Sequence, residues 1–177
     1  MSKSIIFLTG ASGVGKTTLM EQLKLKYKDS NWSFLHFDSI GVPSLSEMIT
    51  SFGSPSNWQE QTTYTWIYKL LFEIPNETIF FEGQVNLNFI IKGFEKYNFK
   101  RFQIILIDCN EQVMSYRLTQ KRKQPELLTD DMKNWLIYLR NQALGMGIPI
   151  IDTSHLSESS VLHALEELIK LEPTIGN

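Results

Sequence analysis

The stretch Gly10-Ala-Ser-Gly-Val-Gly15-Lys16-Thr17 decides the fold of this 177-residue chain. An apolar run, Ser4–Thr9, precedes it, and Thr17–Lys28 follows it with apolar residues at helical spacing. Glycine lets such a loop curl until consecutive backbone N–H groups point inward, where they attract an anion. A strand, a glycine-rich loop and a helix in this order predict an anion-binding loop at a helix N-terminus.

The same stretch matches G-x-x-x-x-G-K-[ST] at every fixed position, which is the Walker A or P-loop pattern. Lys16 supplies a positive charge for the β- and γ-phosphates of a nucleotide, and Thr17 offers a hydroxyl ligand to Mg²⁺. We therefore predict that the chain binds ATP with Mg²⁺, and we expect Lys16 to face solvent when no nucleotide is bound. The predicted phosphate-binding residues are Gly10, Ala11, Ser12, Gly13, Val14, Gly15, Lys16, Thr17 and Thr18, with Thr17 as the metal ligand.

Five short apolar runs predict the strands of a sheet, and several of them lack alternation, which is typical of parallel strands covered on both faces. They are Ser4–Thr9, Trp32–Asp38, Thr78–Glu82, Phe102–Asp108 and Ile148–Asp152. Helical patterns occur between and after them, at Thr17–Lys28, Asn110–Lys123, Thr129–Leu144 and Ser157–Leu171. This order predicts an α/β protein with a three-layer α/β/α P-loop NTPase fold and a five-stranded parallel sheet.

The interval 41–75 carries no strand signal. Ser44 with Glu47, and Ser56 with Gln59, have capping-box spacing, so we predict two helices, the second ending near Glu73. The second helix is rich in aromatic residues, which either pack on the core or line a substrate pocket. We expect this interval to be a helical substrate-binding insertion within a single domain that spans residues 1–177.

The composition is 42% hydrophobic and 20% charged with a formal net charge of −2, so no global basic field draws the chain to nucleic acid or an anionic membrane. No apolar run approaches the roughly 18 residues that span a bilayer. A single cysteine, Cys109, forms no internal disulfide, and the three histidines show no zinc-ligand spacing with it. We expect a cytoplasmic protein without a membrane partner, either monomer or homodimer.

The P-loop, the five strand runs and the basic helix after the fourth run resemble the small P-loop kinases. That group includes nucleoside-monophosphate kinases, gluconate and shikimate kinases, and the kinase domains of polynucleotide repair enzymes. The segments HFDSIGVPS, FFEGQVNLNFI, IILIDCN and DDMKNWLIYLRNQA also resemble a bacterial group of small ATP-binding proteins. The narrower resemblance carries no substrate with it, and no N-K-x-D motif for guanine occurs, so ATP is what the family implies.

The resemblance implies roles for two carboxylates. In several of these kinases an aspartate at the end of the second strand orients or deprotonates the accepting hydroxyl, and Asp38 has that place here unless it caps the turn before Gly41. Glu82 ends the third run, where related kinases usually carry aspartate, and this departure leaves open whether Glu82 contacts the metal or holds the substrate. Gln84 and Asn86 follow it as hydrogen-bonding candidates, and the arginine that often grips a nucleotide phosphate at this place is absent.

The segment YRLTQKRKQPE lies where small kinases carry a lid over ATP, and we expect a short lid at 117–128. A positioned guanidinium stabilises the negative charge of phosphoryl transfer, so Arg117 and Arg122 are candidates for it, although a basic helical run is often a solvated face. Arg140 is a third possibility. The predicted catalytic set is Lys16, Asp38, Glu82, Arg117 and Arg122.

Three functions compete. The first is a kinase that transfers the γ-phosphoryl group of ATP to a hydroxyl of an unidentified small molecule, held between Asp38, the 41–75 helices and Glu82. The second is a nucleotide or nucleic-acid end kinase, which the mild acidity of the chain disfavours because such binding needs a basic surface. The third is an ATP-binding and hydrolysing switch that has no phosphoryl acceptor. Nothing in the sequence rejects the third.

Overall fold

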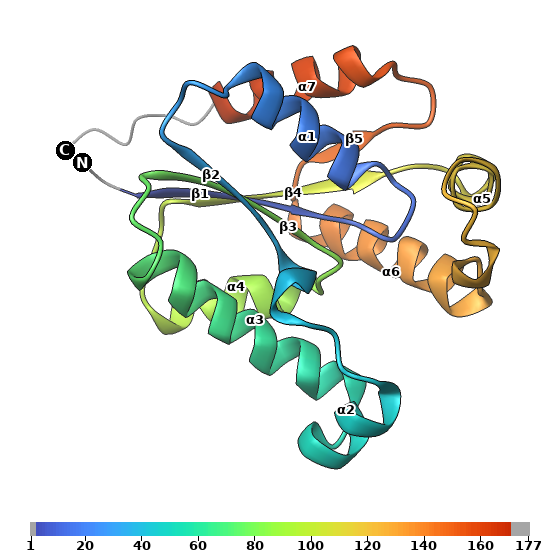
Figure 1. Cartoon of the computed structure of the whole chain (residues 1–177), viewed down its shortest axis with the longest axis horizontal. Helices are drawn as coiled ribbons and strands as arrows, with labels where there is room; N and C mark the ends of the chain where they lie inside the picture. The colour runs from blue at the N-terminus through green and yellow to red at the C-terminus, as the bar shows by residue number, and fades with distance from the viewer. Residues whose placement is uncertain (1–2, 171–177) are drawn as a thin grey trace.

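A single five-stranded sheet forms the centre of the computed structural model, which describes residues 3–170 (Figure 1). The strand order is β2-β3-β1-β4-β5 and every pairing is parallel. The strands are β1 (Ser4–Thr9), β2 (Trp32–His36), β3 (Thr78–Gly83), β4 (Phe102–Asp108) and β5 (Ile150–Asp152). Because β1 lies between β3 and β4, the loop that follows it opens at the middle of the carboxyl edge of the sheet.

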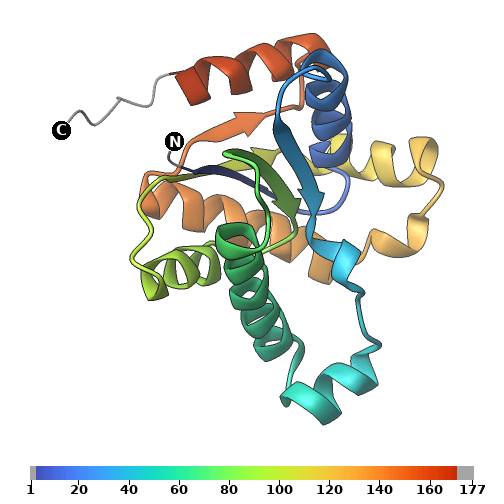
Figure 2. The same cartoon turned by 60° about the vertical axis from the view of Figure 1, so that its left-hand side comes forward.

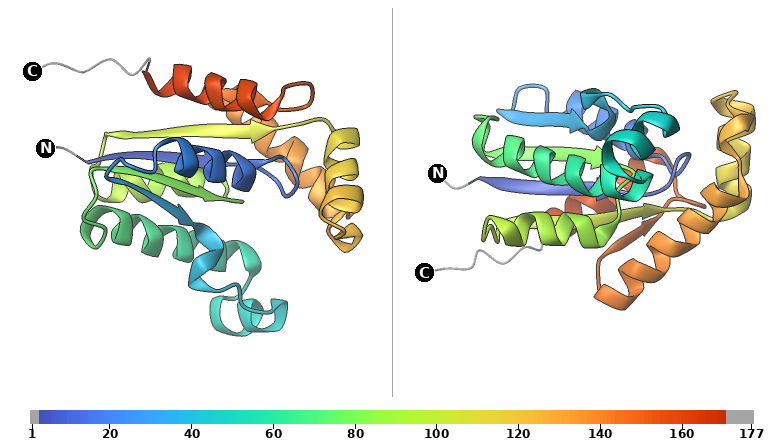
Figure 3. Two further views of the ribbon diagram at one scale, coloured as in Figure 1. Left: turned by 45° about the horizontal axis from the view of Figure 1, so that its top comes forward. Right: turned by 90° about the horizontal axis from the view of Figure 1, so that it is seen from below.

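Helices cover both faces of this sheet, which confirms the predicted three-layer α/β/α architecture. One face carries α1 (Lys16–Lys26) and α7 (Glu158–Lys170); α3, α4 and α6 lie across the other, the face seen from below in Figure 3. The remaining helical bounds are α2 (Leu45–Phe52), α3 (Pro55–Phe72), α4 (Leu87–Lys96), α5 (Glu111–Tyr116) and α6 (Asp130–Met146). Leu171, which ends the predicted last helix, lies outside the described residues.

Successive side chains along each strand point to opposite faces of the sheet, so the core has two halves. Phe7 and Phe81 face α3, α4 and α6, whereas Phe80 faces α1 and α7, and all three rings are fully buried. Phe7 and Phe81 meet edge to face with ring centroids 4.9 Å apart. Burial of one such ring stabilises the fold by about 2–3 kcal/mol, so both faces of the sheet are held firmly against their helices.

Several predicted boundaries differ from the observed ones. The second strand ends at His36, and Asp38 belongs to the short 3-10 helix η1 (Phe37–Ile40) that follows. α6 continues past Gly145 to Met146, because Gly147, at φ 65°, supplies the left-handed residue that ends it. The helix α4 was not predicted at all, although Asn86 caps it through Asn88.

The interval 41–75 forms two helices, as predicted, and α2 projects away from the sheet (Figure 2). Ser44 and Glu47 form the expected capping box at the start of α2. The second predicted cap is wrong: Ser54, rather than Ser56, accepts a hydrogen bond from the backbone N–H of Asn57 at the start of α3. Pro55 at the first helical position favours this earlier start, because its ring presets a helical φ and its missing N–H costs nothing there.

The predicted basic helix after β4 is interrupted. α5 ends at Tyr116 and continues as the π-helical turn η2 (Arg117–Lys121), which is followed by the 3-10 turn η3 (Pro125–Leu127). Lys123 adopts a left-handed backbone at φ 54° between them. Within residues 3–170, none of the helices is both long enough and apolar enough to cross a bilayer.

Candidate functional site

The loop from Gly10 to Gly15 joins β1 to α1 and depends on glycine at specific points. Gly13 and Gly15 have φ of 82° and 105°, values that side-chain-bearing residues rarely adopt. At Gly10 an added Cβ would lie 2.2 Å from the backbone oxygen of Ile107 in β4. The loop therefore presses against the neighbouring strand, and its N–H groups are held at the start of α1 as an anion site requires.

Lys16 does not face solvent, which corrects the sequence expectation. Its side chain is buried, with 9% exposure, and its Nζ donates to the backbone oxygens of Gly10 and Ala11, each at 2.9 Å. Burial lowers the pKa of Lys16, an effect that the Glu82 and Asp38 carboxylates oppose. The P-loop carbonyls thus hold the ammonium group within the loop.

Thr17 and Thr18 begin α1 with exposed side chains. Mg²⁺ in nucleotide sites takes one or two protein oxygens and completes its shell with phosphate and water. The Thr17 hydroxyl, with no hydrogen-bond partner among residues 3–170, and the Glu82 carboxylate near Lys16 fit that donor set. No group of three or more His, Cys, Asp or Glu side chains in this part of the chain forms a metal site by itself.

Two carboxylates and one imidazole meet at the carboxyl ends of β2 and β3. Glu82 is buried and lies opposite His36 in the strand register, where its Oε1 is 2.7 Å from His36 Nδ1. Asp38 is exposed on η1 and has no hydrogen-bond partner in residues 3–170. Neighbouring protein atoms and the Glu82 carboxylate raise the pKa of Asp38, while Lys16 and His36 oppose this rise. Sequence reasoning did not assign His36 to the site; its place two residues before Asp38, on the same side of the predicted strand, was the available signal.

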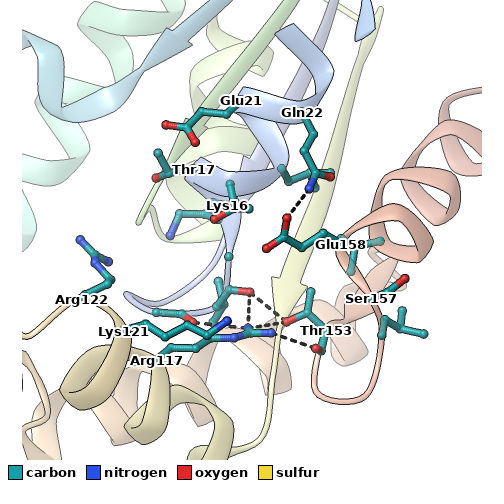
Figure 4. Close-up of a pocket in the computed structure, with 17 residues that line it drawn as sticks. Lys16, Thr17, Glu21, Gln22, Arg117, Lys121, Arg122, Thr153, Ser157 and Glu158 are labelled. Atoms are coloured by element: carbon teal, nitrogen blue, oxygen red, sulfur yellow. Dashed lines mark hydrogen bonds between the residues drawn. The ribbon is translucent and has the colours of Figure 1, made fainter. Parts of the chain in front are cut away.

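Arg117, at the first position of η2, directs its hydrogen bonds to the P-loop and to Thr153. Its Nη1 donates to the backbone oxygen of Val14 at 2.9 Å and to Thr153 Oγ1 at 2.8 Å, and its Nη2 donates to the backbone oxygen of Thr153 at 3.0 Å. Thr153 Oγ1 in turn donates to Val14. These bonds tie the outer side of the P-loop to the segment after β5 (Figure 4). The catalytic role predicted for Arg117 stays a prediction, and this geometry favours a positioning role.

A cavity of about 570 Å³ opens beside the P-loop between α1, η2 and the segment that joins β5 to α7. Lys121 and Arg122 line one side of it, and Ser157 and Glu158 line the other (Figure 4). Leu156 also lines the cavity. The Arg122 guanidinium contributes to lowering the pKa of Lys16, so these two cations lie within electrostatic reach of each other. The cavity has room for a nucleoside next to the phosphate loop.

Arg140, the third arginine candidate, pairs with a carboxylate of the sheet. Its Nε is 2.5 Å from Asp108 Oδ2, and its Nη2 also donates to Asp108 and to the backbone oxygen of Cys109. Asp108 is buried at the end of β4. This pair joins α6 to the sheet. Burial raises the pKa of the Cys109 thiol to about 11, so that thiol stays protonated at neutral pH.

A network of neutral amides follows β3. Gln84 accepts a hydrogen bond from the Ser12 hydroxyl of the P-loop at 3.0 Å, and Gln59 of α3 donates to the Gln84 backbone oxygen at 3.1 Å. Asn86 accepts from Gln142 of α6 at 3.0 Å and donates to Tyr138 OH at 3.2 Å. The structure therefore places Gln84 beside the P-loop and Asn86 next to α6, and it adds Gln59, Tyr138 and Gln142 as neighbours that sequence reasoning had not connected to them.

Two of the five aromatic residues of α3 belong to the buried core. Trp58 and Trp66 are buried, and Trp66 Nε1 donates to the backbone oxygen of Phe37 at 2.9 Å, which anchors η1 to α3. Tyr68 and Phe72 are exposed and pack beside Tyr97 of α4. The first of the two interpretations of these rings, core packing, holds for the buried tryptophans.

Comparison with solved structures shows that this fold is that of the small P-loop kinases. A shikimate kinase from Acinetobacter baumannii in complex with shikimate superposes with a TM-score of 0.64 at 14% identity, covering 95% of this chain and 93% of that one. A gluconokinase from Sinorhizobium meliloti 1021 gives a TM-score of 0.62 at 17% identity, covering 96% and 93%. A deoxyadenosine kinase from M. mycoides gives 0.58 at 12% identity, covering 94% and 98%.

Sequence comparisons add less. A family model described as Novel STAND NTPase 3 matches residues 1–55, a stretch that contains the P-loop, β2 and Asp38. Comparison with curated proteins found no significant match. The resemblance to small P-loop kinases is thus supported by the fold, and at these identities the fold is all that the structural likeness establishes.

Proposed function

We propose that this protein is an ATP-dependent kinase that transfers the γ-phosphoryl group to a hydroxyl of a small molecule. The observation that carries the proposal is the grouping of Lys16, Asp38 and Glu82 at the P-loop edge of the sheet, where the two carboxylates act electrostatically on the lysine. A phosphate donor and a hydroxyl acceptor both need to meet at such a point. The kinase fold of the compared structures supports the assignment.

Each residue has a role in this proposal. The P-loop N–H groups and Lys16 hold the β- and γ-phosphates, and the nucleoside occupies the cavity between Lys121 and Leu156. Thr17 binds Mg²⁺, which when present supplies charge neutralisation between the phosphates. Asp38 orients the acceptor hydroxyl and takes its proton as the new oxygen–phosphorus bond forms and the bond to ADP breaks. Arg122, from the proposed lid at 117–128, stabilises the charge on the transferred group.

A switch that hydrolyses ATP without an acceptor is the second candidate function. The match of residues 1–55 to the Novel STAND NTPase 3 model favours it, since it covers the same P-loop and η1. The two functions differ in one property: a kinase passes phosphate to an organic hydroxyl, whereas a switch passes it to water.

The deciding experiment follows the γ-phosphate. The protein is incubated with γ-labelled ATP and Mg²⁺, alone and with a metabolite mixture, and labelled organic phosphate is separated from inorganic phosphate. We expect labelled organic product that disappears in the Lys16→Ala variant and persists in Lys24→Ala, a matched exposed lysine on the same helix. Release of inorganic phosphate alone, at one rate with and without metabolites, would reject the kinase in favour of the switch.

A further inference from the structure

The side of the site that receives the acceptor carries almost no fixed positive charge. Residues 29–91 contain β2, η1, α2, α3, β3 and the segment up to the first turns of α4, and Lys69 is the single lysine or arginine among them. The same residues include Asp38 and Glu82. In the proposed kinase these segments surround the accepting hydroxyl.

Lys69 lies at the end of α3 that is far from the P-loop, so its charge does not compensate for the carboxylates of Asp38 and Glu82. It stands in the last turn of that helix, and its Nζ is 3.4 Å from Oε2 of Glu73, the residue that follows the helix. The same turn lies at the amino edge of the sheet, because Lys3, just before β1, donates to the backbone oxygens of Leu70 and Leu71. The P-loop begins at the opposite end of β1, so the length of the strand separates Lys69 from the site.

The cations that other elements bring to this edge already have partners or other positions. Arg140 is bound to Asp108, and Arg117 is bound to Val14 and Thr153. Lys121 and Arg122 line the nucleotide cavity. In the proposed reaction Lys16 contacts the nucleotide phosphates. The one imidazole of residues 29–91, that of His36, has its Nδ1 2.7 Å from Glu82 Oε1.

The groups that remain for recognising an acceptor are neutral hydrogen-bonding groups and carboxylates. Gln84 offers its amide next to the P-loop, where it accepts from Ser12, and Gln59 and Asn86 adjoin it through hydrogen bonds along the segment after β3. Tyr138 and Gln142 of α6 bond to Asn86. Asp38 offers a carboxylate with no hydrogen-bond partner among residues 3–170. An acceptor with its own carboxylate or phosphate would approach Asp38, Glu82 and a triphosphate together, and residues 29–91 place no lysine or arginine beside it to pair with that charge.

We propose that the acceptor is a small hydroxyl compound without negative charge, either a neutral polyol or an alcohol that carries an amine. Amides and carboxylates accept and donate hydrogen bonds to several hydroxyls at once, and a carboxylate also pairs with an ammonium group. This inference rests on the proposed kinase activity and specifies the chemical class of its substrate. It sets the chain apart from a fold neighbour that was solved with shikimate, a carboxylate.

The test sorts candidate acceptors by charge, so the acceptor itself can be unidentified. A bacterial metabolite extract is passed over an anion exchanger at pH 8, which retains carboxylates and phosphates and lets neutral and cationic compounds through. Each fraction is incubated with the protein, γ-labelled ATP and Mg²⁺, and labelled organic product is counted. We expect the unretained fraction to yield at least about tenfold more product than the retained one, given the cost of placing like charges together.

The outcomes separate the inference from the proposed function. More product from the retained fraction overturns the inference and leaves the kinase standing. Product from neither fraction, with inorganic phosphate released, rejects the kinase and the inference with it. Lys69→Gln serves as the control variant: it should keep the same preference, and a change of preference would show that this lysine contacts the acceptor after all.

Discussion

We predict that Lys16 exchanges partners when a nucleotide binds, because its ammonium group is held by the Gly10 and Ala11 oxygens at 2.9 Å in the chain without nucleotide. We predict that Lys16→Ala weakens the binding of a non-hydrolysable ATP analogue by about 10- to 200-fold, the value of one or two charge-assisted contacts. Isothermal titration calorimetry with Mg²⁺ measures this, and Lys24→Ala on the exposed side of α1 should bind as the parent does. Unchanged affinity in Lys16→Ala would remove the P-loop from the nucleotide site.

Asp38 is the residue that separates binding from transfer. Asp38→Asn keeps the shape of the side chain and loses the proton acceptor, so we predict that phosphoryl transfer falls by about 10²- to 10⁴-fold while affinity for ATP stays within about threefold. The rate is measured as labelled product under saturating ATP. A rate equal to that of the parent would reduce Asp38 to a residue of the η1 turn.

The raised pKa of Asp38 also predicts an effect on stability. A carboxyl whose pKa is higher in the folded than in the unfolded state adds stability at low pH, and this contribution is lost as the pH rises through the folded-state value. Asp38→Asn should therefore raise the free energy of unfolding at pH 7.5, and the gain should shrink as the pH approaches about 4, the ordinary range of a carboxyl. Urea denaturation across that range measures it, with Asp29→Asn as an exposed control. Destabilisation by Asp38→Asn at pH 7.5 would contradict the predicted sign.

At the scale of single residues, the sequence predicts those site residues whose positions follow a fixed spacing along the chain. The P-loop positions depend on local backbone geometry, so G-x-x-x-x-G-K-[ST] identified them directly. The partners of Arg117 and Glu82 lie 36 and 46 residues away, at Thr153 and His36, and no local pattern reveals such pairs. Recognising these pairs requires the order of the strands in the sheet.

Among the elements, the starts of helices were predicted well only where the capping residues were unambiguous. Ser44 with Glu47 identified α2, whereas Ser54 and Ser56 both precede α3 and only one caps it. α4 was missed although Leu87, Ile90, Ile91 and Phe94 follow the i, i+3, i+4, i+7 spacing of an amphipathic helix. Its apolar face packs against α3 and the sheet.

The choice of cap at α3 gives a direct test at the scale of one element. Ser54 Oγ accepts from the Asn57 N–H at 3.1 Å, while Ser56 is exposed within the first turn. Ser54→Ala should lower the free energy of unfolding by about 1 kcal/mol, and Ser56→Ala should change it by less than about 0.5 kcal/mol. Chemical denaturation of the two variants side by side measures the difference. A larger loss in Ser56→Ala would restore the cap that the sequence had suggested.

For the whole molecule, the order of the strands along the chain followed from the sequence, as did that of the helices apart from α4, but the order of the strands in the sheet did not. Alternating apolar runs and helices required a parallel sheet with covered faces. Only the structure places β3 between β1 and β2, and this placement is what brings Glu82 next to the P-loop and Asp38 close to both. The order of the strands therefore brings together Lys16, Asp38 and Glu82, which the sequence had identified separately.

The proposed reaction predicts that nucleotide and acceptor each stabilise the folded chain. A ligand that binds only the folded chain at 100 times its Kd adds about 2.7 kcal/mol, which for a chain of this size corresponds to a rise of about 5–11 °C in Tm. We predict this rise with a non-hydrolysable ATP analogue and Mg²⁺, and a further rise when the unretained metabolite fraction is added to the nucleotide complex. A kinase holds donor and acceptor together, so the second rise should exceed that produced by the fraction without nucleotide. A switch has one ligand to bind; equal shifts with and without the metabolites, in a protein that still binds the analogue, would identify it as the switch.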